Sequence, residues 1–335
     1  MKKKPVHVTF FGASVTEQSV HHRTHERTGF VNVFAEDFAE ANGFIVSRVS
    51  AGSSDITDGG IVYTEKVIEL RPDVCVLDWV TPATIKCDPR VIEQIVHRLL
   101  EHNILPVAVF FPRTDRVQKE TPIAREIHRI FNDLMLPLYD IADRLDGVPL
   151  EKILRDTVHT NCFGARVYAE IILDILLETD LELFDVPKRP PPLYVNRVSS
   201  DSSPPAAARN VSIVPCKGID GPLEFFVVLE QRVGPYSPLL DVNMVSGMGV
   251  SPERLETYSV LDPWCHRERQ CIKRITGWHH ADGLRKIILS CSSSMPPLAK
   301  RLDLKDGGTS PRHLKPRGDM FVVSNRRVSF RAIWS

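Results

Sequence analysis

The chain has 335 residues, of which 43% are hydrophobic and 25% are charged, a composition typical of globular proteins and a length that favours two domains over one small one. Its 42 basic and 42 acidic residues cancel, so charge gives no reason to expect a nucleic-acid partner or an anionic membrane. No apolar run approaches the ~20 residues that span a bilayer, and the one behind Lys2–Lys4 ends at Gly12 without a signal-peptide cleavage site. Seven scattered cysteines with no C-x-x-C pair favour reduced thiols and a cytoplasmic protein.

The first half of the chain alternates between strand and helix patterns. Residues 6–16, VHVTFFGASVT, read as a buried strand that breaks at Gly12 and delivers Ser14 onto a tight turn. Further apolar strands are expected at 44–49, 74–80, 106–111 and 136–141, and helices at 28–42, 58–70, 89–103, 121–134 and 163–178. Apolar strands between amphipathic helices predict an α/β domain over 1–185, with a doubly wound parallel sheet covered on both faces.

The composition changes after residue 185. Prolines at 187 and 190–192, followed by the Ser- and Pro-rich stretch 199–205, predict a linker over 186–209. Beyond it the pattern favours strands at 210–216, 223–231, 285–293 and 320–334, separated by turns rich in Gly, Pro and Asp. Residues 210–335 are therefore predicted to form a second, mainly antiparallel β-sandwich domain.

Residues with useful chemistry follow several strands of the first half. Ser14, Gly52 and the pair Asp78–Trp79 all lie where a predicted strand ends, and Arg113 follows the next strand in the sequence FFPRTD. Doubly wound sheets bind ligands at the carboxyl ends of their strands. The sequence therefore predicts a site at this edge of the sheet.

A stretch far downstream supplies two groups that a serine nucleophile needs. Asp156 and His159 lie three residues apart in DTVHTNCFG, residues 156–164. In a Ser-His-Asp arrangement the imidazole accepts the serine proton and the carboxylate orients the ring. An Asp-x-x-His pair alone is more often a solvated loop or a helix cap, so a catalytic role depends on whether the pair meets Ser14 in the fold.

Together these stretches resemble the SGNH (GDSL-like) hydrolase family over residues 5–180. FGASVT, residues 11–16, is similar to the family's first block, with Ser14 at the nucleophile and Ala13 where Asp is usual. SAG at 50–52 is similar to its second block, and 156–164 to its last block.

This resemblance implies a flavodoxin-like, three-layer SGNH hydrolase fold. It also implies a triad of Ser14, His159 and Asp156, with an oxyanion hole formed by the backbone N–H groups of Ser14 and Gly52. No metal and no organic cofactor are implied. The resemblance does not extend to residues 190–335.

One block departs from the family pattern. The family has Gly-x-Asn-Asp after the third strand, and this Asn donates to the oxyanion, whereas the present chain has LDWVTPAT at 77–84. Thr81, or the backbone of the Trp79–Thr81 turn, is left as the substitute donor. Losing one oxyanion donor lowers the rate by about 10²–10³, so the sequence predicts either a replacement donor or a slow catalyst.

Three side chains near the expected site are predicted to contact the substrate: Trp79, His21 and Arg113, the last with a surface ion pair as its alternative. His21 and His25 have the i, i+4 spacing of a metal pair on a helix, but no Glu lies between them in the H-E-x-x-H manner, and no metal is predicted. In the second domain, Trp264 and Trp278 are candidates for a sugar-stacking surface or for sandwich core.

The sequence as a whole predicts a serine esterase that acts on a small-molecule or carbohydrate ester. Within the family the implied substrates include carbohydrate O-acetyl esters, and the appended β domain favours a carbohydrate or glycosylated substrate by analogy. Two alternatives stay open: an acyl- or acetyltransferase that uses the same triad, and a non-catalytic protein that binds a glycan or a partner. The three triad residues favour an enzyme, whereas the missing Asn favours the binding protein.

Overall fold

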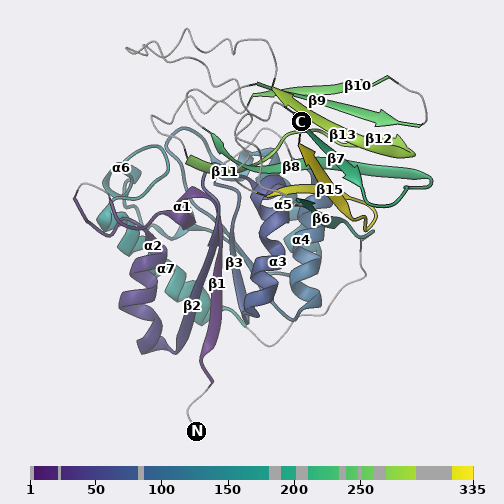
Figure 1. The fold of residues 1–335 in the computed structure, drawn as a ribbon. Helices are drawn as coiled ribbons and strands as arrows, with labels where there is room; N and C mark the ends of the chain where they lie inside the picture. The colour runs from purple at the N-terminus through teal and green to yellow at the C-terminus, as the bar shows by residue number, and fades with distance from the viewer. Residues whose placement is uncertain are drawn as a thin grey trace, which may run out of the picture. The chain divides into compact units, whose positions relative to one another are not determined.

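Figure 1 shows the computed structural model, which describes residues 4–21, 24–81, 87–180, 190–200, 210–233, 239–247, 251–259, 269–291 and 319–334. The chain divides into two compact units, Met1–Pro190 and Pro191–Ser335. No helix among the described residues is long and apolar enough to cross a membrane.

The first unit is built on a five-stranded parallel sheet with strand order β2-β1-β3-β4-β5. Its strands are β1 (Val6–Gly12), β2 (Phe44–Ser50), β3 (Val74–Asp78), β4 (Leu105–Phe110) and β5 (Leu138–Asp140). The register pairs Gly12 with Ser50 on one side and with Asp78 on the other, so the carboxyl ends of these three strands lie level. The predicted parallel sheet is confirmed, and the ends of β1, β2 and β3 meet at one edge.

Helices lie on both sides of this sheet in Figure 1. They are α1 (Ser14–Glu17), α2 (Phe30–Val33), α3 (Ile61–Leu70), α4 (Pro89–Glu101), α5 (Pro122–Asp133), α6 (Leu150–Ile153) and α7 (Cys162–Glu178). Shorter or non-α turns are η1 (Phe34–Ala39), η2 (Glu40–Asn42), η3 (Ile56–Gly60), η4 (Gln118–Glu120) and η5 (Ile141–Arg144). α2 packs against α7, and α3 packs against α4.

Strand β1 shows why the strands read as unbroken apolar runs. Successive side chains of a strand point to opposite faces. Phe10 packs edge-on against Phe30 of α2, with ring centroids 5.5 Å apart, and Phe11 packs edge-on against Trp79 at 5.1 Å. Because both faces of β1 are covered, apolar side chains predominate along it, and the buried Thr9 hydroxyl is hydrogen-bonded to Ser47 Oγ at 2.6 Å. The expected three-layer α/β fold is confirmed.

The second unit is a mainly antiparallel β structure. Its described residues form a ten-stranded sheet of order β10-β9-β13-β7-β15-β6-β14-β8-β11, with β12 also paired to β8. The strands are β6 (Tyr194–Ser200), β7 (Asn210–Pro215), β8 (Pro222–Val233), β9 (Leu239–Ser246), β10 (Glu253–Ser259), β11 (Arg269–Arg274), β12 (His279–Asp282), β13 (Leu284–Cys291), β14 (Met320–Ser324) and β15 (Phe330–Trp334). Among these pairings, only that of β15 with β6 is parallel.

Strand β6 connects the two layers of this unit. Its residues 194–197 pair with β14, whereas 198–200 pair with β15. A strand that changes partners along its length makes a corner between two sheet layers. One core cluster is shared by both layers and includes Ile213, Phe225, Val242, Ile287 and Val322. The predicted sandwich-like architecture is therefore confirmed.

Two boundaries in this half differ from the prediction. β6 lies within 186–209, so the linker prediction is wrong for residues 194–200. Only Asn196 and Val198 of this strand are buried, and the surrounding Pro and Ser residues obscured so short a pattern. The single strand expected at 320–334 is two strands, because the chain turns at 325–329 and places β14 and β15 beside different parts of β6.

Asn196 holds this corner together. Its buried side-chain Nδ2 donates to the Val322 carbonyl at 3.0 Å and to Ser324 Oγ at 2.8 Å, and its Oδ1 accepts from the Val328 N–H at 2.9 Å. We expect Asn196→Ala to lower the free energy of unfolding by about 2–4 kcal/mol, because several buried polar groups lose their partner at once. Urea unfolding measures this change. Ser199→Ala, on the exposed side of the same strand, is the control, and equal effects of the two variants would contradict the prediction.

Candidate active site

Ser14 begins α1 only two residues after β1 ends. Ala13 lies between them with φ −95° and ψ −140°, outside the regular helix and strand regions, and its N–H donates to the Asp78 carbonyl at 3.3 Å. A Cβ atom at Gly12 would lie 2.8 Å from that carbonyl oxygen and 2.4 Å from Thr16 Oγ1. Only glycine leaves room for the strand to turn here. The turn presents the half-buried Ser14 side chain at the carboxyl edge of the sheet.

Asp156 and His159 lie on a tight loop that precedes α7. A β-bridge joins Leu154 to Thr160 across the loop, and the Arg155 N–H donates to the His159 carbonyl at 2.8 Å. Inside the loop, Asp156 Oδ1 accepts from the His159 N–H at 2.8 Å. Closed in this way, the loop holds the carboxylate and the imidazole at a fixed separation.

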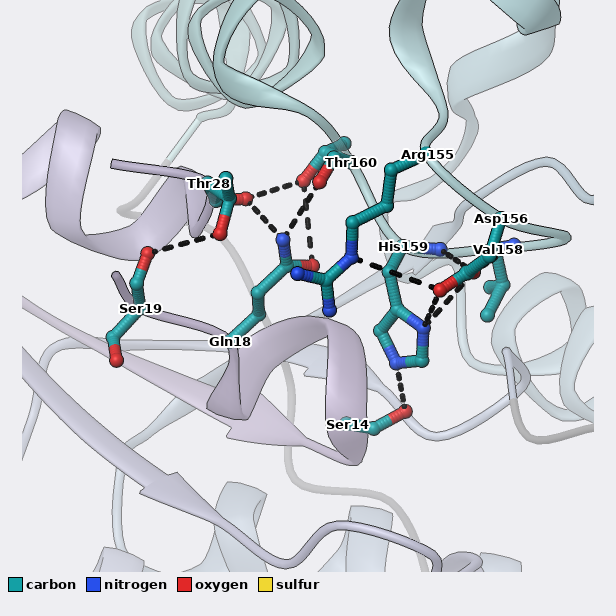
Figure 2. Close-up of polar contacts among 9 residues, drawn as sticks. All are labelled: Ser14, Gln18, Ser19, Thr28, Arg155, Asp156, Val158, His159 and Thr160. Carbon is teal, nitrogen blue, oxygen red and sulfur yellow. Dashed lines mark hydrogen bonds and ion pairs between the residues drawn. The ribbon is translucent and has the colours of Figure 1, made fainter. Parts of the chain in front are cut away.

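His159 connects Ser14 to Asp156, as Figure 2 shows. Its Nε2 lies 3.0 Å from Ser14 Oγ, and its Nδ1 lies 3.0 Å from each carboxylate oxygen of Asp156. With its proton on Nδ1, the ring donates to Asp156 and leaves Nε2 free to accept the Ser14 hydroxyl proton. The structure thus brings together the three side chains that the sequence predicts as catalytic.

Hydrogen bonds keep the Asp156 carboxylate ionised. Desolvation by partial burial acts to raise its pKa, but bonds from the His159 ring and from the His159 and Val158 N–H groups outweigh it and hold the pKa well below its ordinary value. Arg155 Nε also lies 3.7 Å from this carboxylate. Asp156 therefore carries a negative charge at neutral pH, which suits a group that holds the Nδ1 proton of His159.

A second set of contacts, also drawn in Figure 2, fixes the segments of Ser14 and His159 against each other. Gln18 Nε2 donates to the carbonyls of Thr28 at 2.6 Å and Thr160 at 2.7 Å, and Thr160 Oγ1 donates to the same Thr28 carbonyl at 2.6 Å. Gln18 follows Ser14 by about one helical turn, and Thr160 follows His159 directly. The sequence analysis missed this group, because a glutamine after a serine turn belongs to no motif.

Two backbone N–H groups at this edge, those of Ser14 and Gly52, have no acceptor among the described residues. Ser14 lies at the start of α1, where N–H groups have no partner within the helix. Gly52 is held beside β1 because the preceding Ala51 N–H donates to the Gly12 carbonyl at 3.1 Å. Both groups predicted as oxyanion donors are thus left unbonded, and their role stays a prediction.

Thr81, the expected substitute for the missing Asn, is hydrogen-bonded to other groups of the protein. Its buried hydroxyl donates to Asp78 Oδ1, and its carbonyl accepts from Arg113 Nη1 at 3.0 Å. A hydroxyl has one proton, so in this arrangement the Thr81 side chain has none to give to an oxyanion. The following residues 82–86 lie outside the described part of the chain.

Two of the predicted substrate-binding residues have internal roles. Trp79 is 1% exposed and packs against Phe11, so it belongs to the core and presents no surface to a substrate. Arg113 makes its alternative, an ion pair: Nε and Nη2 donate to Asp115 at 2.7 and 2.9 Å, while Nη1 binds Thr81. Both follow a strand end, but their side chains are directed by packing and by the ion pair.

His21, the third predicted substrate contact, lies on the loop between α1 and α2. Its Nδ1 is 3.0 Å from Thr24 Oγ1, and its N–H donates to the Glu26 carbonyl at 2.9 Å. The described residues here, His21 and 24–27, are not helical, so the helical-spacing argument for a metal pair with His25 does not hold. Across the described residues, no group of three His, Cys, Asp or Glu side chains gathers as a metal site.

Of the two aromatic candidates of the second unit, the structure describes Trp278, which is half-buried. Trp278 packs edge-on against Phe226, with centroids 4.8 Å apart, and the Arg274 guanidinium lies over the Phe226 ring at 3.9 Å. Trp264 lies outside the described residues.

Asp78 is a second carboxyl group at the same edge of the sheet, and its pKa is shifted in the opposite direction to that of Asp156. It is 1% exposed, and burial raises its pKa to about 7, although hydrogen bonds from Thr81 and Thr16 act to lower it. The buried hydroxyl of Tyr168 has no hydrogen-bond partner among the described residues, and burial together with the Asp78 charge raises the Tyr168 pKa. Asp78 therefore keeps its proton to a higher pH than an exposed Asp does.

Comparison with known proteins gives matches in structure only. No protein-family model and no curated protein sequence matches the chain. The crystal structure of a two-domain esterase active on acetylated mannans aligns with a TM-score of 0.61 at 12% identity, covering 97% of this chain and 92% of that one. The present chain has the fold of that two-domain esterase. The resemblance to SGNH/GDSL-like esterases is thereby confirmed at the level of the fold.

Shorter structures match the equivalent of about half the chain. An acetyl xylan esterase aligns at 18% identity with a TM-score of 0.41, covering 50% of this chain and 98% of that one. An acetylxylan esterase from Geobacillus stearothermophilus aligns at 13% identity with a TM-score of 0.41, covering 54% and 98%.

The buried carboxyl of Asp78 predicts a pH-dependent stability. Its pKa in the folded chain is about 7, against an ordinary value of 3.8, so between these values the unfolded chain loses a proton that the folded chain keeps. The contribution of Asp78 to stability is therefore fully present below the lower value and is lost as pH rises to the upper one. Relative to Asp78→Asn, which does not titrate, we expect the wild-type free energy of unfolding to fall by up to about 4 kcal/mol between about pH 4 and pH 8. Urea unfolding across this range measures the difference, and a constant difference would contradict the prediction.

Proposed function

We propose that this chain is a serine esterase that removes O-acetyl groups from a carbohydrate or glycosylated substrate through an acyl-enzyme. The observation that carries the proposal is the bonded series Ser14–His159–Asp156, in which one imidazole lies 3.0 Å from both the hydroxyl and the carboxylate. This geometry stands at the carboxyl edge of a parallel sheet, where doubly wound folds bind their ligands.

In the first half of the proposed reaction, Ser14 Oγ attacks the ester carbonyl carbon while His159 Nε2 takes its proton. Asp156 accepts the hydrogen bond from Nδ1–H and stabilises the imidazolium that forms. The negative charge that develops on the carbonyl oxygen is bound by the N–H groups of Ser14 and Gly52. His159 then gives its proton to the leaving alcohol oxygen, and the acyl group stays on Ser14.

In the second half, water attacks the acyl-enzyme. His159 takes a proton from the water, the tetrahedral intermediate again places its charge on the two N–H groups, and the Ser14–acyl bond breaks as His159 returns the proton to Ser14 Oγ. The products are a carboxylic acid and the free serine. A bound hydroxyl in place of water would make the same site an acyltransferase, so the acceptor decides between these two activities.

The proposed substrate class is supported by the fold. The two-domain esterase that aligns over both units is active on acetylated mannans, and a second crystal structure of it contains mannopentaose. On this basis acetylated manno-oligosaccharides are the first substrates to test, with p-nitrophenyl acetate as a substrate that needs only the triad.

The decisive test is covalent labelling of Ser14 by a fluorophosphonate, followed by release of acetate from p-nitrophenyl acetate and from acetylated oligosaccharides. We expect wild-type protein to be labelled, and Ser14→Ala and His159→Ala each to lower acetate release by at least about 10³-fold, because either change removes the nucleophile or its base. His102→Ala, an exposed histidine at the end of α4, is the matched control and should retain activity.

A folded wild-type protein that is neither labelled nor active would contradict the esterase proposal and favour the binding-protein alternative. Labelling with transfer of acetyl to a sugar hydroxyl, without free acetate, would place the activity with the acyltransferases.

Asp156→Asn tests how much the negative charge of Asp156 contributes to catalysis. An amide keeps the size of the side chain but lacks the charge that stabilises the imidazolium. Because the Asp156 side chain is 46% exposed, water shares this stabilisation, and we expect kcat to fall by about 10²–10⁴, less than for His159→Ala. Steady-state kinetics at neutral pH measure the effect, and an unchanged kcat would remove Asp156 from the mechanism.

A further inference from the structure

Asp78 occupies an unusual position for a carboxyl group. It ends β3, directly opposite Gly12 in the parallel ladder, and the rest of that strand is apolar and buried. Burying a carboxyl is unfavourable unless it is hydrogen-bonded, and no Lys or Arg pairs with Asp78 among the described residues. An apolar side chain would pack there at lower cost, so the contacts that Asp78 makes need an explanation.

These contacts reach both sides of the proposed active site. Asp78 Oδ2 accepts from Thr16 Oγ1 at 2.9 Å, and Oδ1 accepts from the Thr81 hydroxyl. Thr16 lies in α1, two residues after Ser14. One carboxyl group therefore bonds the short helix that carries the nucleophile to the turn that follows β3.

The same turn is bonded onward to the loop of the proposed base. The Thr81 carbonyl accepts from Arg113 Nη1 at 3.0 Å, and the neighbouring Thr114 N–H donates to the Thr157 carbonyl at 3.1 Å. Thr157 lies between Asp156 and His159, and His159 bonds Ser14 at 3.0 Å. Starting from Ser14, the contacts pass through Thr16, Asp78, Thr81, Arg113, Thr114, Thr157 and His159 and return to Ser14.

We propose that Asp78 is a positioning residue that closes this ring of contacts and so fixes Ser14 Oγ relative to His159. The inference rests on the proposed function, since it concerns the reactivity of Ser14. Asp78 itself touches neither the nucleophile nor the base. It acts through the hydroxyls of Thr16 and Thr81, and a small displacement of a reacting group is enough to lower a rate strongly.

The test compares how fast a fluorophosphonate labels Ser14 in variants that are folded by circular dichroism. We expect Asp78→Ala, which loses both hydroxyl contacts, to lower the second-order labelling rate by about 10–100-fold. Asp78→Asn should stay within about threefold of wild type, because an amide accepts through Oδ1 and donates through Nδ2 to a hydroxyl oxygen. With p-nitrophenyl acetate, kcat should fall in Asp78→Ala while KM changes little, which is the signature of a misplaced nucleophile.

Leu99→Ala provides the stability-matched control. Leu99 is fully buried in α4 and takes no part in the ring, so its truncation destabilises the unit without touching Ser14. It should label within about twofold of wild type. Equal labelling rates in Asp78→Ala and Leu99→Ala would overturn the proposal while leaving the esterase intact, whereas an unlabelled wild type would overturn both.

Thr16 gives an independent test should Asp78→Ala fail to fold. Thr16→Val keeps the shape of the side chain but removes the hydroxyl that bonds Asp78, and Thr16→Ser restores it. We expect the valine variant to label at least about fivefold more slowly and the serine variant to recover to within about twofold. A valine variant that labels as fast as wild type would contradict the proposed role of Asp78.

Discussion

The close approach of β1 and β3 at their carboxyl ends is the constraint on which the site depends. Because Gly12 has no side chain, the Asp78 backbone and the Thr16 hydroxyl occupy space that a Cβ atom would fill. The chain can then leave the sheet after Ala13 and start a helix at Ser14. A bulkier residue would push α1 away from β3, and it would separate Ser14 from His159 and Thr16 from Asp78 together.

Two carboxyl groups at the same sheet edge are held in different protonation states by their surroundings. Asp156 is partly exposed and accepts several N–H bonds, so the ionised form is favoured. Asp78 is buried, and this desolvation outweighs the hydrogen bonds from two hydroxyls and raises its pKa to about 7. Active sites often contain two residues of the same type whose environments shift their pKa values in opposite directions, so that the two residues have different roles. In the proposed mechanism, one group stabilises a cation and the other holds the backbone in place.

The sequence predicts those features that arise from local patterns, and it does not predict those that arise from contacts between distant segments. Strands β3 and β4 are buried along their whole length and read as nearly continuous apolar runs, and Ser14, Asp156 and His159 stand in recognisable motifs. The bonds of Gln18 to Thr28 and Thr160 leave no local pattern. The place of Trp79 after a strand predicts a substrate contact, but packing against Phe11 decides the direction of its side chain. In the second unit, strands such as β9 alternate between buried and half-buried residues, which makes a weak hydrophobic pattern in the sequence.

The pairing of β6 in the second unit has a consequence for biosynthesis. Among the described residues β6 is the first strand of that unit, yet its partners β14 and β15 are the last two. During translation, residues 194–200 emerge long before the segments that complete their layer, and contacts between such distant segments form slowly. The α/β unit, whose strands all precede them, has its full sequence available earlier. Folding on the ribosome should therefore proceed in two stages, with the nucleophile-bearing unit complete while the β unit still awaits its C-terminal strands.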